Sequence, residues 1–259
     1  MTTNPSIPRL ITFPPSSDCE VGRWALRHYG VQVNEQPNAP PFFLAAVVLR
    51  GGRKFPLLLT ETMIVNGAKP IIDYYELVVD PAKKLIPDQY KAEIEEAFQN
   101  YNVNMGTNTV RWAYTHLLPH KDIMIRPLSL NTPGYQQFVV KYCYGLPKSF
   151  LWRALKLGPE AAEASLKIIQ DTFEQVNQKL ADGRPYLVGD RFTLADLAFS
   201  VSGAPLVLPD GYGGYQFEQG PVPTFEQFPE EAKAVVSKMR ETPAGQFILR
   251  IYREERYRN

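Results

Sequence analysis

Cysteine is scarce in this chain of 259 residues, which contains only Cys19 and Cys143. Two cysteines so far apart do not form a disulfide framework, so we expect a reducing compartment, the cytoplasm. Histidine is equally rare, and His28, His116 and His120 lack the paired spacing of metal ligands. No CxxC motif supplements them, so we expect no metal site.

Long apolar runs and an excess of one charge are also absent. The longest apolar run, Phe42 to Leu49, is far shorter than the ~20 residues of a membrane-spanning helix. The net charge is only +1, and no basic field indicates a nucleic acid or an anionic membrane. The first residues lack the features of a secretory signal. From the charge balance and the short apolar run we expect neither a nucleic-acid nor a membrane partner. Phosphate-loop, dinucleotide-binding and nucleophile-elbow motifs are missing as well, which sets aside the catalytic sites that use them.

The composition that is present, 44% hydrophobic and 21% charged, is that of a globular protein with one large or two modest cores. Strand and helix patterns alternate up to about residue 80, and only helical patterns follow. We therefore predict two domains, residues 1–80 and residues 81–259. The first has the order strand, helix, strand, (helix), strand, strand, helix, which is typical of a thioredoxin-like domain.

The turn Pro14-Pro15-Ser16-Ser17 precedes a predicted helix that ends at Gly30. It is rich in small hydroxylated residues. A helix N-terminus offers free N–H groups and about half a positive charge, which suits a thiolate or a carboxylate. Ser17 and Glu20 have the spacing of a capping box, so their plainest interpretation is that they begin the helix. Ser16 is not needed for that cap, and its hydroxyl is free to point at a bound anion.

The same turn carries a family resemblance, through Ser16-Ser17-Asp18-Cys19 followed by Arg23, Leu26 and Gly30-Val31. It resembles the start of a serine-type glutathione transferase, in which a serine three residues before a cysteine hydrogen-bonds the glutathione sulfur. The resemblance implies that Ser16 is the catalytic residue and glutathione the co-substrate. It also implies a small hydrophobic electrophile as partner, a role in detoxification, and a homodimer.

A second resemblance lies in the helical half, where Tyr186-Leu187-x-Gly189-Asp190 is followed by Thr193-Leu194-Ala195-Asp196. It is similar to the helical-domain signature of glutathione transferases. Independently of the family, Thr193 and Asp196 have the spacing of an N-capping box in front of an apolar helix. A buried helix start needs such a cap because water cannot satisfy its N–H groups.

The resemblance extends to the glutathione-binding residues of the first domain, Ser17, Phe55, Pro56, Asn66 and Gly67. Phe55-Pro56 corresponds to the cis-proline, and the Phe55 backbone would pair with the cysteine of glutathione. Asn66-Gly67 stands where the family has an acidic residue followed by Ser. Asn66 can still hydrogen-bond, and the Gly67 N–H at a helix start can bind a carboxylate. The alternative is that Asn-Gly is only a turn.

Residues 88–118 are expected to form a long helix, interrupted at Gly106. Tyr101, Met105 and Trp112 share one face of it. By the family resemblance, that face would line a hydrophobic substrate cleft against the first domain; the alternative is an interdomain or subunit contact. Four more helices are expected at residues 135–154, 159–180, 229–240 and 242–257, with Cys143 a buried apolar residue.

Three functions remain open at this stage. The first is activation of the glutathione thiol by Ser16 for attack on the electrophile. The second is thiol transfer with Cys19 as nucleophile, since thiolates are favoured in the first turn of a helix. The third is a non-catalytic binding protein that retains the fold, which the Asn66-Gly67 departure favours.

Overall fold

The structure, a computed structural model, describes residues 7–214 and 220–258. Its sheet has four strands in the order β2-β1-β3-β4. The strands are β1 (Arg9–Thr12), β2 (Asn34–Pro37), β3 (Leu57–Leu59) and β4 (Ile64–Asn66). β2 runs parallel to β1, β3 is antiparallel to β1, and β4 is antiparallel to β3. This topology confirms the predicted thioredoxin-like fold.

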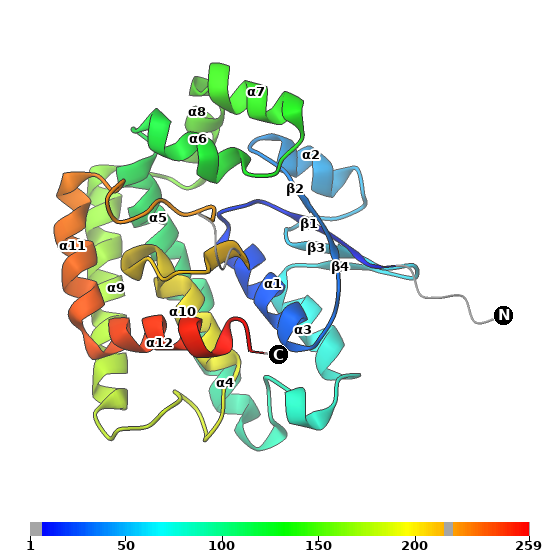
Figure 1. Cartoon of the computed structure of the whole chain (residues 1–259), viewed down its shortest axis with the longest axis vertical. Helices are drawn as coiled ribbons and strands as arrows, with labels where there is room; N and C mark the ends of the chain where they lie inside the picture. The colour runs from blue at the N-terminus through cyan, green and yellow to red at the C-terminus, as the bar shows by residue number, and fades with distance from the viewer. Residues whose placement is uncertain (1–6, 215–219, 259) are drawn as a thin grey trace.

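Helices cover both faces of the sheet (Figure 1). Because side chains alternate along a strand, Leu10 and Leu58 pack with Leu26 of α1 (Ser17–His28) and Ile71 of α3 (Ala68–Glu76). The neighbouring strand residues, Ile11 among them, pack on the other face against α2 (Phe42–Val48). The apolar run that began at Phe42 is therefore a helix, not a strand.

The rest of the described chain is helical, which confirms the predicted all-helical C-terminal part. Its α-helices are α4 (Lys91–Phe98), α5 (Gly106–Leu117), α6 (Lys121–Ser129), α7 (Gly134–Tyr142), α8 (Gly145–Ala154), α9 (Pro159–Leu180), α10 (Leu194–Val207), α11 (Glu230–Glu241) and α12 (Pro243–Glu255). The sequence did not reveal α6, and the helix predicted at 135–154 is divided into α7 and α8. Cys143 ends α7 and is exposed, not buried as expected.

A π-helical segment, η3 (Gln99–Met105), joins α4 to α5 without a break in the helix. The interruption expected at Gly106 is thus a widening of the helix just before that glycine. Such π-segments change the phase of the residues that follow them. This phase decides which side chains of α5 face the sheet domain.

The core of the helical half surrounds α10, which packs against α12, α5, α4 and α1. The predicted capping box of α10 is confirmed: the Thr193 N–H donates to Asp196 Oδ2 at 2.8 Å, and the Thr193 side chain accepts from the Asp196 backbone. The other oxygen, Asp196 Oδ1, accepts from the Leu187 N–H at 2.7 Å. Both residues are fully buried. Asp196 thus has a structural role at this helix start.

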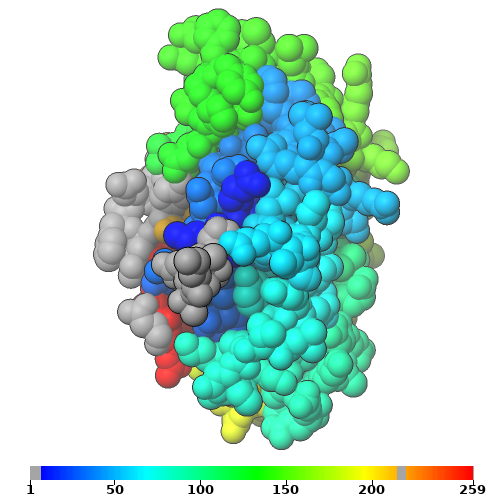
Figure 2. Space-filling model, turned by 90° about the vertical axis from the view of Figure 1, so that its right-hand side faces the viewer, coloured from blue at the N-terminus to red at the C-terminus, as the bar shows by residue number. Residues whose placement is uncertain are grey.

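On the face seen in Figure 2, residues of the sheet domain occupy the middle, below a lobe that contains α6 and α7. Within residues 7–214 and 220–258, no helix combines the length and apolarity needed to span a bilayer.

Candidate functional site

Ser16 is the N-cap of α1: its side-chain oxygen accepts from the Cys19 N–H at 3.3 Å. The predicted capping box of Ser17 and Glu20 is therefore wrong by one residue. A serine hydroxyl has one proton to donate and can accept as well. Because the cap uses Ser16 Oγ as an acceptor, the cap itself does not occupy the hydroxyl proton.

Glu20 does not cap the helix because it is turned into the interior, where it pairs with an arginine from the other end of the chain. Arg256 Nε lies 2.8 Å from Glu20 Oε1, and these side chains are 2% and 0% exposed. Arg23 Nη1 lies 3.7 Å from the second Glu20 oxygen, and Arg23 also pairs with Glu35 at 2.8 Å. This network ties α1 to α12 and to β2, and so orients the start of α1.

A cavity of about 500 Å³ opens at the N-terminus of α1, and Ser16 lines it. Residues 13–18 form one wall with α2 and Phe55, while α5 and the end of α8 form the other. The site predicted at this turn thus has an open pocket, unfilled by the protein's own side chains. Asp18, at the rim, accepts from Asn102 Nδ2 at 2.9 Å and so joins the two walls.

The wall of the cavity is strongly aromatic. Phe43 is central, with ring centroids 5.1 Å from Phe13, 4.8 Å from Phe55 and 5.7 Å from Phe150. Such distances are typical of attractive aromatic contacts. Of these four, only Phe55 was predicted as a site residue from the sequence, and that for its backbone. Phe13 directly precedes the hydroxylated turn, which is the one signal that could have revealed it.

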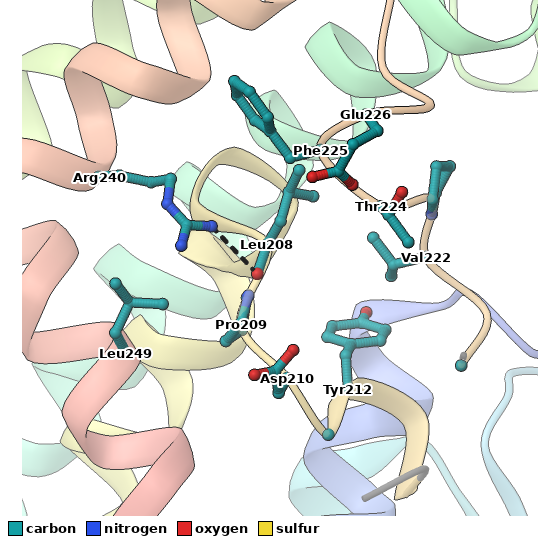
Figure 3. Close-up of a pocket in the computed structure, with 13 residues that line it drawn as sticks. Leu208, Pro209, Asp210, Tyr212, Val222, Thr224, Phe225, Glu226, Arg240 and Leu249 are labelled. Carbon is teal, nitrogen blue, oxygen red and sulfur yellow. Dashed lines mark hydrogen bonds between the residues drawn. The ribbon is translucent and has the colours of Figure 1, made fainter. Parts of the chain in front are cut away.

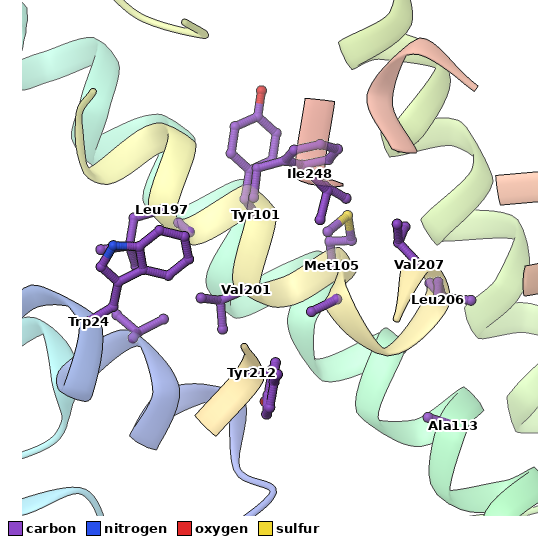
Figure 4. Close-up of a cluster of buried hydrophobic side chains, with 14 of the residues drawn as sticks. Trp24, Tyr101, Met105, Ala113, Leu197, Val201, Leu206, Val207, Tyr212 and Ile248 are labelled. Carbon is purple, nitrogen blue, oxygen red and sulfur yellow. The ribbon is translucent and has the colours of Figure 1, made fainter. Parts of the chain in front are cut away.

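The predicted cleft residues Tyr101, Met105 and Trp112 do not line this cavity. They are 7%, 0% and 1% exposed and belong to the core of the helical half, where Figure 4 shows Tyr101 and Met105 beside residues of α10. Tyr101 packs on Phe199 with centroids 5.1 Å apart. The cleft was thus predicted on the correct helix but on the wrong face of it. The large apolar side chains of this face are buried against α10.

The face that lines the cavity is the adjacent one, on which residues recur every four positions. Its members along η3 and α5 are Asn102, Gly106, Val110 and Tyr114, with Thr107 and Arg111 beside them. This four-residue spacing can be seen in the sequence. Its mixture of polar, small and β-branched residues hid it, since such a face is also typical of a solvated surface.

Cys19 is fully buried, and its sulfur accepts a hydrogen bond from the Phe13 N–H at 3.4 Å. Burial raises the pKa of this thiol to about 12. A protonated, inaccessible thiol is a poor nucleophile. The alternative of Cys19 as nucleophile is therefore wrong.

The Phe55-Pro56 peptide bond is cis, as predicted, and lies directly before β3. Within the described ranges, no hydrogen bond occupies the Phe55 N–H or carbonyl. Its backbone is thus free to pair with an extended peptide at the edge of the cavity.

Asn66 and Gly67 are engaged by the protein itself. Asn66 Oδ1 accepts from the Arg53 N–H at 2.6 Å, and the Gly67 N–H donates to the Pro56 carbonyl at 2.8 Å. The expectation that the Gly67 N–H binds a carboxylate is therefore wrong. Gly67 has φ +92°, a backbone conformation that favours glycine. Only the Asn66 amide nitrogen remains for a ligand.

A second cavity, of about 350 Å³, lies between the loop that follows α10 and residues 220–226 (Figure 3). Arg240 faces into it and donates to the Leu208 carbonyl at 3.3 Å. Tyr212, which also lines it, donates to the Pro15 carbonyl at 3.3 Å. No residue of the α1 start lines this cavity, so it is separate from the site at Ser16. No cluster of three His, Cys, Asp or Glu side chains suited to a metal occurs among the described residues.

Comparison with known proteins identifies the fold. Residues 139–202 match the family model "Glutathione S-transferase, C-terminal domain". No curated protein sequence matches the chain significantly. This match includes the pattern Tyr186 to Asp196 of the helical half and does not extend to the turn at Ser16.

Solved structures with the same fold include several glutathione transferases. That of Ceriporiopsis subvermispora, in complex with glutathione, has 13% identity over 98% of both chains and a TM-score of 0.56. A β-etherase from Sphingobium sp. strain SYK-6 has 17% identity, covers 95% of this chain and 99% of that one, and has a TM-score of 0.53. The enzyme of Sinorhizobium meliloti 1021 has 19% identity, coverages of 95% and 93%, and a TM-score of 0.51. The chain therefore has the fold of these glutathione transferases, and part of its helical half matches the model of their C-terminal domain.

Proposed function

We propose that this protein binds glutathione at the N-terminus of α1 and activates its thiol for attack on a small hydrophobic electrophile in the adjoining cavity. The observation that supports this most directly is the position of Ser16. Its hydroxyl caps α1 as an acceptor, so the cap does not occupy its proton, and Ser16 lines an open cavity.

The chemistry follows from the ionisation of a thiol. A free thiol with a pKa near ~8.5 is only a few per cent ionised at neutral pH. A hydrogen bond from Ser16 and the positive end of α1 both favour the thiolate, and together they can lower the pKa by about two units. The reactive fraction then rises more than tenfold. Ser16 need not lose its own proton.

The remaining glutathione contacts are assigned to residues 1–80, which we propose as the glutathione-binding domain, with 81–259 as the helical domain. The free Phe55 backbone beside cis-Pro56 would pair with the peptide, and Ser17 would face the same cavity. The Asn66 amide nitrogen would meet the γ-glutamyl end. A homodimer, a cytoplasmic location and a role in detoxification belong to the same proposal, and sedimentation tests the oligomeric state.

Serine variants test the proposal. Ser16→Ala should abolish most conjugation of glutathione to an aryl halide and raise the pKa of the bound thiol, read from thiolate absorbance. Loss of the cap also costs ~1 kcal/mol of stability, so Ser16→Thr, which retains a hydroxyl, controls for that effect. Ser17 lines the same cavity without capping α1, so Ser17→Ala should raise the KM for glutathione and leave the pKa of the bound thiol unchanged. Full activity in Ser16→Ala would refute the mechanism.

A non-catalytic binding protein is the second candidate. The engaged Asn66 oxygen and Gly67 N–H favour it, because the family's acidic and serine groups have no free replacement there. Retention on immobilised glutathione without any conjugation would support this candidate. Absence of both would exclude glutathione as the ligand.

A further inference from the structure

We propose that the cavity beside Ser16 accepts aromatic ligands that carry an acidic group, and that Arg111 and Lys156 bind this group. The inference rests on the proposed function, because this is the cavity assigned to the electrophile. It names the substrate class, which the fold leaves open.

The first support is the contrast between the cavity's charged residues. Asp18, Arg111 and Lys156 are its charged lining residues. Asp18 is engaged with Asn102. Within the described part of the chain, neither Arg111 nor Lys156 pairs with a carboxylate. Two cations without counter-ions therefore share a pocket with four phenylalanine rings, a combination that suits an aromatic anion.

Arg111 is held in position by neutral groups. Its Nε donates to the Leu155 carbonyl at 3.3 Å, and its Nη1 donates to Asn108 Oδ1 at 3.3 Å. Asn108 Oδ1 also accepts from Ser165 Oγ at 2.9 Å, in the buried interior. These acceptors orient the guanidinium without neutralising it. Its remaining N–H groups can then form charge-assisted hydrogen bonds with a carboxylate or sulfonate.

Lys156 stands at an unusual backbone position just after α8. Its φ is +52°, and the Leu157 N–H donates back to the Trp152 carbonyl at 3.0 Å. This is the helix end at which glycine is the usual residue. A lysine there tolerates an unfavourable backbone conformation. Its exposed side chain contributes a second cation beside Arg111 at the rim of the cavity.

The charges are separated along the cavity. Asn102, which contacts Asp18, and Arg111 are nine residues apart, which corresponds to roughly 13 Å along a helix. The negative charge therefore lies at the α1 end, near Ser16, and the positive charges lie at the α8 end. Phe13, Phe43 and Phe55 line the cavity from the sheet domain, and Phe150 lines it from α8. A ligand would place its reactive end near Ser16, its rings on the phenylalanines and its acidic group on Arg111 and Lys156.

Two dyes of the same skeleton test the inference without any need for turnover. The probes are 8-anilinonaphthalene-1-sulfonate and the uncharged N-phenyl-1-naphthylamine, titrated by fluorescence. We expect wild type to bind the sulfonate about tenfold more tightly, since two partly exposed cations contribute modestly each. The double variant Arg111→Gln, Lys156→Gln should lose this preference while still binding the neutral dye. Lys148→Gln, a cation of α8 outside the cavity, should behave as wild type.

Retention on immobilised glutathione, measured on the same variants, separates this inference from the proposed function. If the double variant loses the preference for the sulfonate dye but is still retained on immobilised glutathione, the inference is supported. If wild type fails to bind glutathione but prefers the sulfonate through these cations, the proposed function fails and the acidic-aromatic site remains. Equal binding of the two dyes by wild type, or a preference that persists in the double variant, overturns it. Loss of glutathione retention in the double variant also overturns it, because the cations would then bind a carboxylate of glutathione itself. Urea unfolding of each variant verifies that the fold is intact.

Discussion

The buried ion pair between Glu20 and Arg256 leads to a quantitative prediction. Its atoms are 2.8 Å apart, and the two side chains are 0% and 2% exposed. Removal of one partner from such a pair usually costs about 3–5 kcal/mol, because an uncompensated charge is left in the interior. Arg256→Met still leaves Glu20 with Arg23 at 3.7 Å, so we expect the lower end, about 3 kcal/mol.

The double variant distinguishes a pair interaction from general damage to the packing. Glu20→Met combined with Arg256→Met removes both charges of the pair, so no unpaired charge of the pair is left in the interior. We expect its cost to fall below the sum of the single variants by about 2 kcal/mol, a size found for directly coupled residues. Arg253→Met is the matched control on α12. Arg253 pairs with Glu254 at the surface, and its loss should cost less than about 1 kcal/mol.

Urea unfolding followed by tryptophan fluorescence measures these effects. The Arg256 guanidinium carbon lies 5.3 Å from the ring centroid of Trp24, so the emission of this residue reports on the pair directly. An Arg256→Met protein no less stable than Arg253→Met would refute the reasoning. The reasoning would also be refuted if the stability loss of the double variant equalled the sum of the losses of the two single variants.

Three further predictions concern Asp196, the two cysteines and Asn66. Burial raises the pKa of Asp196 from 3.8 to about 7, so between about pH 4 and 7 the native state holds a proton that the unfolded chain has released. The free energy of unfolding of wild type should therefore fall relative to Asp196→Asn as pH rises through this range; urea midpoints at several pH values check this, and a relative rise contradicts it. A thiol reagent should label the exposed Cys143 alone in the native protein and both cysteines in urea, whereas native labelling of Cys143→Ser would show that Cys19 is accessible. Asn66→Ala should cost ~1 kcal/mol by removing the acceptor of the Arg53 N–H. Asn66→Asp should retain that stability but weaken retention on glutathione, because it loses the amide N–H that would donate to the γ-glutamyl carboxylate and places a like charge there; unchanged or stronger retention would argue against this contact.

The features that could be predicted from the sequence are those decided by neighbouring residues. The capping box of Thr193 and Asp196 spans four residues, and the helix Pro159–Leu180 follows its own apolar spacing. The hydroxylated turn at Ser16 is equally local. Each was recognisable because the groups that interact are held together by the chain itself, whatever the rest of the fold does.

The features that only the tertiary structure decided involve partners far apart in the chain. Ser16 rather than Ser17 caps α1, and Glu20 turns inward, because Arg256 arrives from the opposite end of the sequence. Tyr101 and Met105 are buried because α10 packs on that face, which leaves Asn102 and Arg111 to line the cavity. Such choices depend on free energies of burial and charge pairing that exist only once the domains are packed together, and no local pattern of residues encodes them.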